Sequence, residues 1–121
     1  MTGLWTIIET TEYSAWFLSL SESQQDAIND RIQKIREKGP WLSRPYADHI
    51  KGSKISNLKE LRISSKGALR ILFVFDPTRN AVLLLGGNKA EGHQWNRWYT
   101  NAIPFAEQIY KRHLEESEER E

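Results

Sequence analysis

The feature that most constrains the fold is a set of three short apolar runs in the second half of the chain. The runs span residues 58–63, 68–76 and 81–86 and are rich in Leu, Ile, Val and Phe. Turn-forming residues separate them, at 64–67 (SSKG) and 76–80 (DPTRN). Strands joined by such short turns pair with one another in antiparallel order. The sequence therefore predicts a three-stranded antiparallel meander.

A strand and two helices are predicted before the meander. Residues 4–10 (LWTIIET) are β-branched and aromatic, which is typical of a strand. Residues 21–24 (SESQ) have the form of a capping box, which marks the start of a helix. Apolar side chains at helical spacing define the inner faces of the two helices: Tyr13, Trp16, Phe17 and Leu20 in the first, then Ala27, Ile28, Ile32 and Ile35 in the second. Gly39 and Pro40 are expected to end the second helix.

The remaining segments complete an α+β fold. Residues 41–57 lose periodicity and collect Pro, Gly, Ser and basic residues, which predicts a long loop. A last helix is expected with Pro104 in its first turn, and the acidic residues 115–121 are expected to fray. The predicted order is β-α-α-β-β-β-α in one domain over residues 1–121, with an antiparallel sheet packed against the N-terminal helical hairpin and a C-terminal helix.

Charge is distributed unevenly along the chain, although the net charge is only +1. Residues 44–97 carry ten basic and four acidic side chains, whereas residues 1–43 and 98–121 are both net negative. A basic block inside a nearly neutral protein is typical of a nucleic-acid-binding surface. Lysines and arginines that are simply solvated give the same bias, so charge alone does not choose between the two.

Several classes of site and location are disfavoured by the composition. The chain has no cysteine and no histidine pair with the spacing of metal ligands, so we expect neither a metal nor a cofactor. The N-terminus lacks the basic start and apolar core of a signal peptide, and no apolar run is long enough to span a bilayer. These features predict a cytoplasmic protein.

Side-chain alternation groups ionisable residues on one face of the predicted sheet. Glu60 and Arg62 share a face that is expected to be exposed, and an exposed Arg70 begins the next, otherwise apolar, strand. A charged residue there needs a partner or a cleft. Lys89 follows the third strand, and antiparallel order can bring it near Arg62 and Arg70. Such a cluster can bind phosphate, or it can be an ion pair that merely closes the sheet.

Four segments together resemble a known family. Residues 57–62 (NLKELR), 69–76 (LRILFVFD), 81–89 (AVLLLGGNK) and 102–106 (AIPFA) resemble the phage-derived HigB-like subgroup of the RelE/ParE toxin superfamily. The resemblance covers essentially the whole chain. It implies a compact type II toxin whose partner is an antitoxin with a helix-turn-helix DNA-binding domain, so that operator DNA is met only through the antitoxin. Many members cut mRNA on the ribosome without a metal.

The resemblance also implies roles for individual residues. Cleavage needs a base for the 2′-hydroxyl proton, cations for the charged phosphorane and an acid for the leaving oxygen. Arg70 matches the arginine that starts the family's middle strand and is assigned phosphate stabilisation. Lys89 matches a basic position after the last strand and is assigned phosphate contact or proton donation. Arg62 is a second phosphate clamp, and Glu60 is the best available base.

Four further residues are predicted to contact RNA. Tyr99 and His93 are candidates for base stacking or proton transfer, and Lys51 and Lys54 in the long loop for holding flanking phosphates. Well-known RelE members carry lysines on the strand that here contains Glu60, so a lysine-based mechanism does not transfer. Two alternatives stay open: a non-nuclease toxin of the gyrase-inhibiting ParE type, and a phage-derived accessory protein that acts only by binding its partner.

Overall fold

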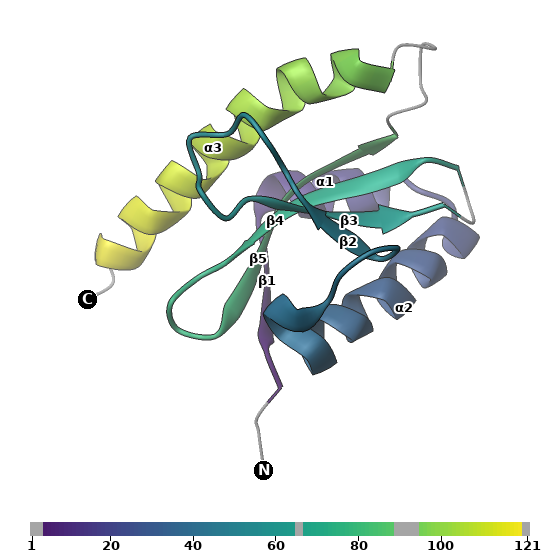
Figure 1. Cartoon of the computed structure of the whole chain (residues 1–121), viewed down its shortest axis with the longest axis horizontal. Coiled ribbons are helices and arrows are strands. Elements are labelled where there is room, and N and C mark those ends of the chain that lie inside the picture. Colours follow the sequence, from purple (N-terminus) through teal and green to yellow (C-terminus); the bar gives the residue numbers. More distant parts are fainter. Residues whose placement is uncertain (1–3, 65–66, 89–94, 120–121) are drawn as a thin grey trace.

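The computed structural model describes residues 4–64, 67–88 and 95–119, which form a five-stranded sheet with helices on both faces (Figure 1). The strands are β1 (Thr6–Glu9), β2 (Ala47–His49), β3 (Lys59–Ile63), β4 (Leu69–Phe75) and β5 (Asn80–Asn88). The helices are α1 (Thr11–Leu18), α2 (Glu22–Lys38), the short 3-10 helix η1 (Gly39–Trp41) and α3 (Trp95–Glu119). The strand order in the sheet is β1-β5-β4-β3-β2.

The sheet contains the predicted meander and two features that the sequence did not predict. Strands β3, β4 and β5 are antiparallel neighbours, as expected. Strand β1, however, pairs in parallel with β5, so the sheet is mixed rather than purely antiparallel. Parallel pairing needs a long crossover, and here the intervening helices and strands provide it. Strand β2 adds a short antiparallel edge strand within residues 41–57, where a loop was expected.

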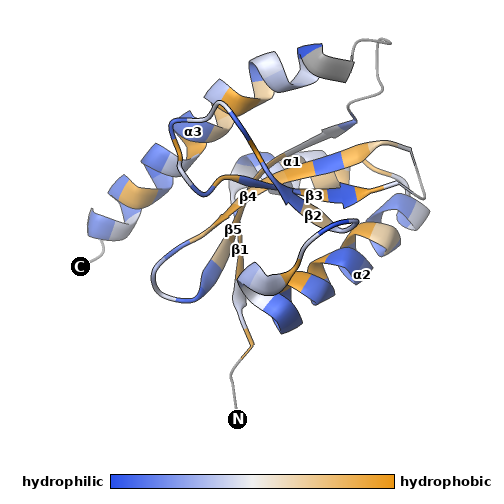
Figure 2. Ribbon diagram, in the orientation of Figure 1, coloured by the Kyte–Doolittle hydropathy of each residue, from blue (hydrophilic) through white to orange (hydrophobic). Residues whose placement is uncertain are grey.

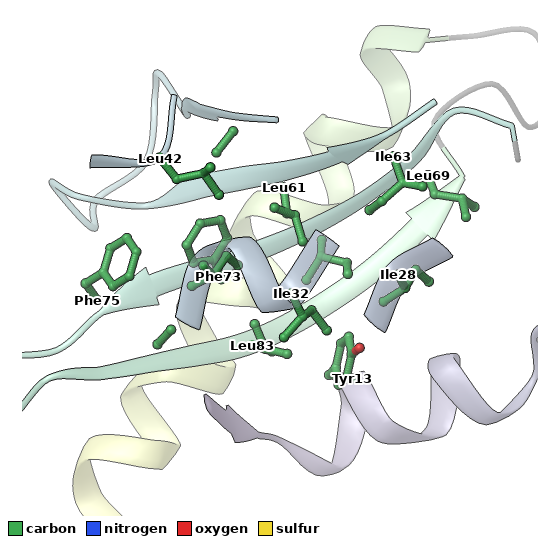
Figure 3. Close-up of a cluster of buried hydrophobic side chains, with 14 residues drawn as sticks. Tyr13, Ile28, Ile32, Leu42, Leu61, Ile63, Leu69, Phe73, Phe75 and Leu83 are labelled. Atoms are coloured by element: carbon green, nitrogen blue, oxygen red, sulfur yellow. The ribbon is translucent and has the colours of Figure 1, made fainter. Parts of the chain in front are cut away.

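Helices α1 and α2 cover one face of the sheet, and their ends follow the sequence signals. Both hydrogen bonds of the predicted capping box, between Ser21 and Gln24, are present at the start of α2. Helix α2 ends at Lys38, and its C-cap is Gly39, whose φ is +56° and where a Cβ would lie 2.3 Å from Nε1 of Trp5. Only glycine satisfies both conditions without strain. Figure 3 shows Tyr13 and isoleucines of α2 directed at side chains of β3, β4 and β5.

Helix α3 covers the opposite face. Ala102, Ala106 and Ile109 pack there in a second buried cluster with four strand residues, Leu72, Val74, Val82 and Leu84, and with Leu58, which precedes β3. The helix begins at Trp95, so the expectation that Pro104 lies in its first turn is wrong; Pro104 lies inside the helix. A proline there removes one backbone donor, but the burial of the apolar stripe on the sheet outweighs this local cost.

The polar surface follows from this layered arrangement. In Figure 2 the strands are mainly hydrophobic, and the helices carry hydrophilic residues on their outer sides. Helix α3 continues to Glu119, so residues 115–119 are helical where fraying was expected. Within the described ranges, no helix is both long and apolar enough to cross a membrane.

Candidate functional site

Strands β3 and β4 place three of the predicted residues on the sheet face beneath α3. Arg62 lies opposite Arg70 in the register, and Glu60 lies opposite Leu72. Leu72 belongs to the cluster that packs against α3, so alternation puts all three charged residues on this same face. The sequence-based grouping of Glu60, Arg62 and Arg70 is therefore confirmed by the register.

The centre of the site is a buried ion pair between Glu60 and Arg70. Nε of Arg70 lies 3.3 Å from Oε1 of Glu60, and the two side chains are only 5% (Arg70) and 10% (Glu60) exposed. Arg70 also donates from Nη1 to the carbonyl oxygen of Leu69 at 2.8 Å. Its Nε is close to the carboxylate but has no hydrogen-bond partner among the described residues, so this contact is electrostatic. The expectation that Glu60 and Arg70 are exposed is wrong, because the face they occupy is covered.

Tyr99 from α3 completes this group. Its hydroxyl donates to Oε1 of Glu60 at 2.6 Å. Burial of the ring, reinforced by the Glu60 carboxylate, raises the pKa of Tyr99 to about 12. The phenol therefore stays protonated near neutral pH and acts as a hydrogen-bond donor rather than as a base. Oε1 of Glu60 thus has both the Arg70 guanidinium and the Tyr99 hydroxyl as neighbours.

Two glycines at the end of β5 allow tryptophans to lie directly on the sheet. A Cβ on Gly87 would lie 2.3 Å from Nε1 of Trp98 in α3, and a Cβ on Gly86 would lie 2.1 Å from Cε3 of Trp16 in α1. The two indoles therefore pack on neighbouring glycines of one strand, from opposite faces. The close approach of Trp98 brings α3 near enough for the next residue, Tyr99, to reach Glu60.

The loop between β2 and β3 is fastened to α3 beside this group. Glu107 accepts hydrogen bonds from the Ser53 hydroxyl at 2.9 Å and from the backbone N–H of Lys54 at 2.6 Å. Figure 1 shows the loop passing alongside the helix. Lys54 and Tyr99 line a common groove of about 340 Å³, while Lys51 is exposed on the same loop. Two of the residues predicted to contact RNA are thus brought together.

The other predicted site residues either form no ion pair with Glu60 or lie outside the described residues. Arg62 is half-buried and, among the described residues, forms no ion pair with Glu60. Lys89 and His93 lie outside the described residues, so their assigned roles stay predictions. Within residues 4–64, 67–88 and 95–119 there is no group of three side chains that could hold a metal ion.

Sequence reasoning missed two charged residues at the edge of this face. Asp48 in β2 lies opposite Glu60 in the register. Arg44 pairs with Asp48 at 2.6 Å, and this hydrogen-bonded contact holds the pKa of Asp48 below its ordinary value. Strand β2 is too short to show an alternation pattern, so this placement could not be predicted from the sequence.

This arrangement has the components for acid–base chemistry on a phosphate ester. A carboxylate that is fixed by a cation and a neutral donor can accept a proton from a hydroxyl group. A half-buried arginine on the same face can bind a phosphate oxygen and stabilise the negative charge that develops on it. A buried ion pair adds little net stability compared with apolar packing, so stability alone is a weak explanation for this group.

Comparison with known proteins places the chain among phage-derived and toxin proteins. A family described as "Phage derived protein Gp49-like" matches residues 15–111. The chain is 41% identical over 102 residues to "Putative toxin HigB3" of Mycobacterium tuberculosis, an alignment that covers 84% of this chain and 87% of that protein. It is 38% identical over 117 residues to "Putative toxin HigB2" of the same organism, covering 95% of this chain but only 57% of that relative's length.

A solved structure shares the fold. The Escherichia coli toxin RelE in its free state, in a variant with two arginines replaced by alanine, superposes with a TM-score of 0.61. The superposition covers 90% of this chain and 97% of that chain, at 8% sequence identity. At such low identity the likeness establishes the fold alone.

Proposed function

Because the chain belongs to the phage-derived Gp49-like family, and with it to the HigB-like toxins of the RelE superfamily, we propose that it is a type II toxin that cleaves mRNA on the ribosome. The cleavage is metal-independent, takes place in the cytoplasm and inhibits translation. A helix-turn-helix antitoxin is the partner that neutralises it, and operator DNA is bound only through that antitoxin.

The observation that carries this proposal is the Glu60 carboxylate held between Arg70 and the Tyr99 hydroxyl. Burying a charged pair in an otherwise apolar face costs several kcal/mol per ion before the attraction between the ions is counted. A group with that cost, placed beside a groove and a cation, fits an acid–base site better than a purely structural link. The Arg62 side chain adds the cation that a phosphate would meet.

The proposed reaction is an internal attack on the RNA backbone. Glu60 takes the proton from a 2′-hydroxyl, and the 2′-oxygen forms a bond to the adjacent phosphorus. The bond to the 5′-oxygen of the next nucleotide breaks, leaving a 2′,3′-cyclic phosphate and a 5′-hydroxyl. Arg62 stabilises the phosphorane, and Arg70 fixes Glu60 and adds positive charge beneath it. Lys89 is assigned the proton for the leaving oxygen.

The approach of RNA follows from the groove that Lys54 and Tyr99 line. Lys51 and Lys54 hold phosphates that flank the scissile bond. The Tyr99 ring at the wall of this groove, together with His93, offers a stacking surface for a base. Because the Tyr99 hydroxyl is bonded to Glu60, a base that docks in the groove lies near the proposed catalytic carboxylate.

The test replaces the two members of the ion pair separately. Induction of Arg70→Ala or Glu60→Gln should no longer arrest growth, since loss of a general base typically lowers a rate by about 10² to 10⁴. Glu60→Gln keeps nearly the same shape and an oxygen for the Tyr99 hydroxyl, so it reports function if Arg70→Ala unfolds. Arg36→Ala, on α2 across the sheet, is the matched control and should stay toxic.

Folding and antitoxin binding are measured for each variant by circular dichroism and by co-purification with the antitoxin. We expect the Arg70→Ala and Glu60→Gln variants to fold and to bind the antitoxin but not to arrest growth. Full toxicity of a folded Glu60→Gln protein would overturn the assigned site. Growth arrest by the unmodified chain with DNA-damage signalling and intact transcripts would instead support the gyrase-inhibiting alternative.

A further inference from the structure

Lys59 is a buried cation that the proposed cleavage site does not use. It precedes Glu60 in β3, so its side chain points to the opposite face of the sheet, toward α2. The residue is 9% exposed. Its Nζ donates to the carbonyl oxygen of Pro40 at 3.4 Å and lies 5.4 Å from the centre of the Phe75 ring.

The charge of Lys59 is only partly compensated. Among the described residues, no ion pair involves Lys59. The nearby carboxylate of Asp48 is committed to Arg44, at 2.6 Å. One long hydrogen bond and one ring contact are weak replacements for the water that a buried ammonium group loses. Burial accordingly lowers the pKa of Lys59, and the charge of Asp48 opposes this change only in part.

Lys59 also lines a pocket whose walls carry further donors. The pocket has a volume of about 240 Å³, and its polar lining also includes Ser43, Arg44 and His49. The Asp48 carboxylate lines it too and is paired with Arg44. His49 is the register partner of Lys59, so the two side chains share a face. At about 30 Å³ per water molecule, the volume equals that of about eight waters. This is room for a tetrahedral oxyanion and part of what it is attached to.

We propose that this pocket binds a phosphoryl group, presented either by free phosphate or by an RNA backbone. The ammonium of Lys59, the guanidinium of Arg44 and the hydroxyl of Ser43 match the several acceptor oxygens of a phosphate. The bound anion supplies the counter-charge that Lys59 lacks. Lys59 and His49 reach the pocket from the face opposite Glu60, whereas Arg44 and Asp48 lie at the β2 edge of the sheet. None of the described residues assigned to cleavage lines the pocket.

The surroundings of the pocket suit single-stranded RNA. Trp41, next to Pro40, is 89% exposed. Close by in sequence, the ring of Tyr46 has Arg31 at 4.8 Å and Lys34 at 4.7 Å from its centre. Cations combined with an exposed aromatic ring are the features by which single-strand binders hold phosphates and stack bases. The RNA source rests on the proposed function, whereas binding of free phosphate does not.

The experiment follows the backbone amide resonances of residues 43, 44 and 46–49 in the full chain. Inorganic phosphate and a short uridine oligonucleotide are titrated in separate arms, in a phosphate-free buffer. Lys59→Met removes the charge but keeps the apolar stem, so it should fold at least as stably as the unmodified chain. Arg44→Gln is a second variant at an exposed position, and Lys111→Gln on α3 is the matched control.

The expected result is saturable shifts of these resonances that weaken at least threefold in Lys59→Met and Arg44→Gln but not in Lys111→Gln. Shifts with phosphate alone assign the site to the free ion, and shifts with the oligonucleotide assign it to RNA. Absence of shifts in both arms, or unchanged binding by a folded Lys59→Met protein, would overturn the proposal. Arg70→Ala should retain these shifts. A failure of the cleavage proposal can therefore be distinguished from a failure of the phosphate-binding proposal.

Discussion

Arg70 and Glu60 form an ion pair on a sheet face that they share with Arg62 and with the apolar cluster packed against α3. The guanidinium has the Leu69 carbonyl as its hydrogen-bond acceptor, and its Nε lies beside the carboxylate without bonding to it. An Nε with no hydrogen-bond partner is a costly feature in a folded interior. It fits a side chain that gains a further acceptor when a phosphate approaches.

The hydroxyl of Tyr99 is the contact in this group that can be removed with least disturbance. Tyr99→Phe should lower the cleavage rate about tenfold, because Glu60 loses the donor that fixes its orientation, and should cost about 1 kcal/mol of unfolding free energy. Urea unfolding and transcript cleavage measure the two effects. Tyr110→Phe, on the same helix, should change neither. Equal cleavage by the two variants would refute the role of the Tyr99 hydroxyl.

Alanine substitutions of the two β5 glycines test how the tryptophans pack on this strand. Gly87→Ala and Gly86→Ala should each cost about 1 to 3 kcal/mol of unfolding free energy, because the new methyl group displaces an indole. Only Gly87→Ala should also reduce cleavage beyond its effect on stability, since Trp98 is followed by Tyr99. Denaturant unfolding and cleavage by the folded fraction separate these effects. Equal cleavage by the two alanine variants would contradict this positioning of Tyr99.

Individual site residues could be predicted where the two-residue alternation of side chains along a strand was enough to place them. Alternation along β3 correctly grouped Glu60 with Arg62, and the register places Arg70 opposite Arg62. It could not show that α3 covers the group or that Tyr99 is the partner of Glu60, because those contacts join segments 39 residues apart in the chain. The burial of Lys59 was not predicted either, because a lysine in a strand is normally expected to be solvated.

Helices α1 and α3 are joined by an ion pair that no local pattern could reveal. Both oxygens of Glu12 accept hydrogen bonds from Arg112, at 2.5 Å and 2.7 Å. This contact is the main cause that lowers the pKa of Glu12 from its ordinary value of 4.5 to about 2. It connects a helix on one face of the sheet with the helix on the other.

The pH dependence of stability follows from this shift. Because the pKa of Glu12 is lower in the folded state, its contribution is complete above about pH 4.5 and is lost as the pH falls toward 2. Arg112→Gln should therefore cost about 1 kcal/mol near neutral pH, a modest value because Arg112 is 41% exposed, and progressively less as the pH falls from 4.5 toward 2. Urea titrations across this range, with Lys111→Gln as control, measure the difference. A cost that stays constant with pH would exclude this ion pair as its source.

Most elements could be located from the sequence, and the exceptions have physical reasons. The capping box and Gly39 correctly predicted the two ends of α2, because helix caps are formed by residues that are neighbours in the sequence. The predicted start of α3 was wrong because Pro104 was interpreted as a first-turn residue. Tertiary packing instead stabilises a helix that continues on both sides of Pro104. Strand β2 exists through its pairing with β3 rather than through a pattern of its own.

At the scale of the whole molecule, the sheet separates two regions of different chemistry. The α3 face carries the Glu60 and Arg70 pair with Tyr99, and the α2 face carries Lys59 and its pocket. The parallel pairing of β1 with β5 completes the sheet beyond the meander. That pairing was unpredictable from pattern alone, because a strand-like run does not specify which neighbour it joins. The fold class and the family were nevertheless correct.

Cleavage of mRNA by the Glu60 site can be tested by mapping transcript 5′ ends after brief induction of the chain without its antitoxin. We expect discrete new ends within coding regions, carrying 5′-hydroxyl groups, and their absence after induction of Glu60→Gln. Growth arrest without new ends, or the same ends with a folded Glu60→Gln protein, would contradict it.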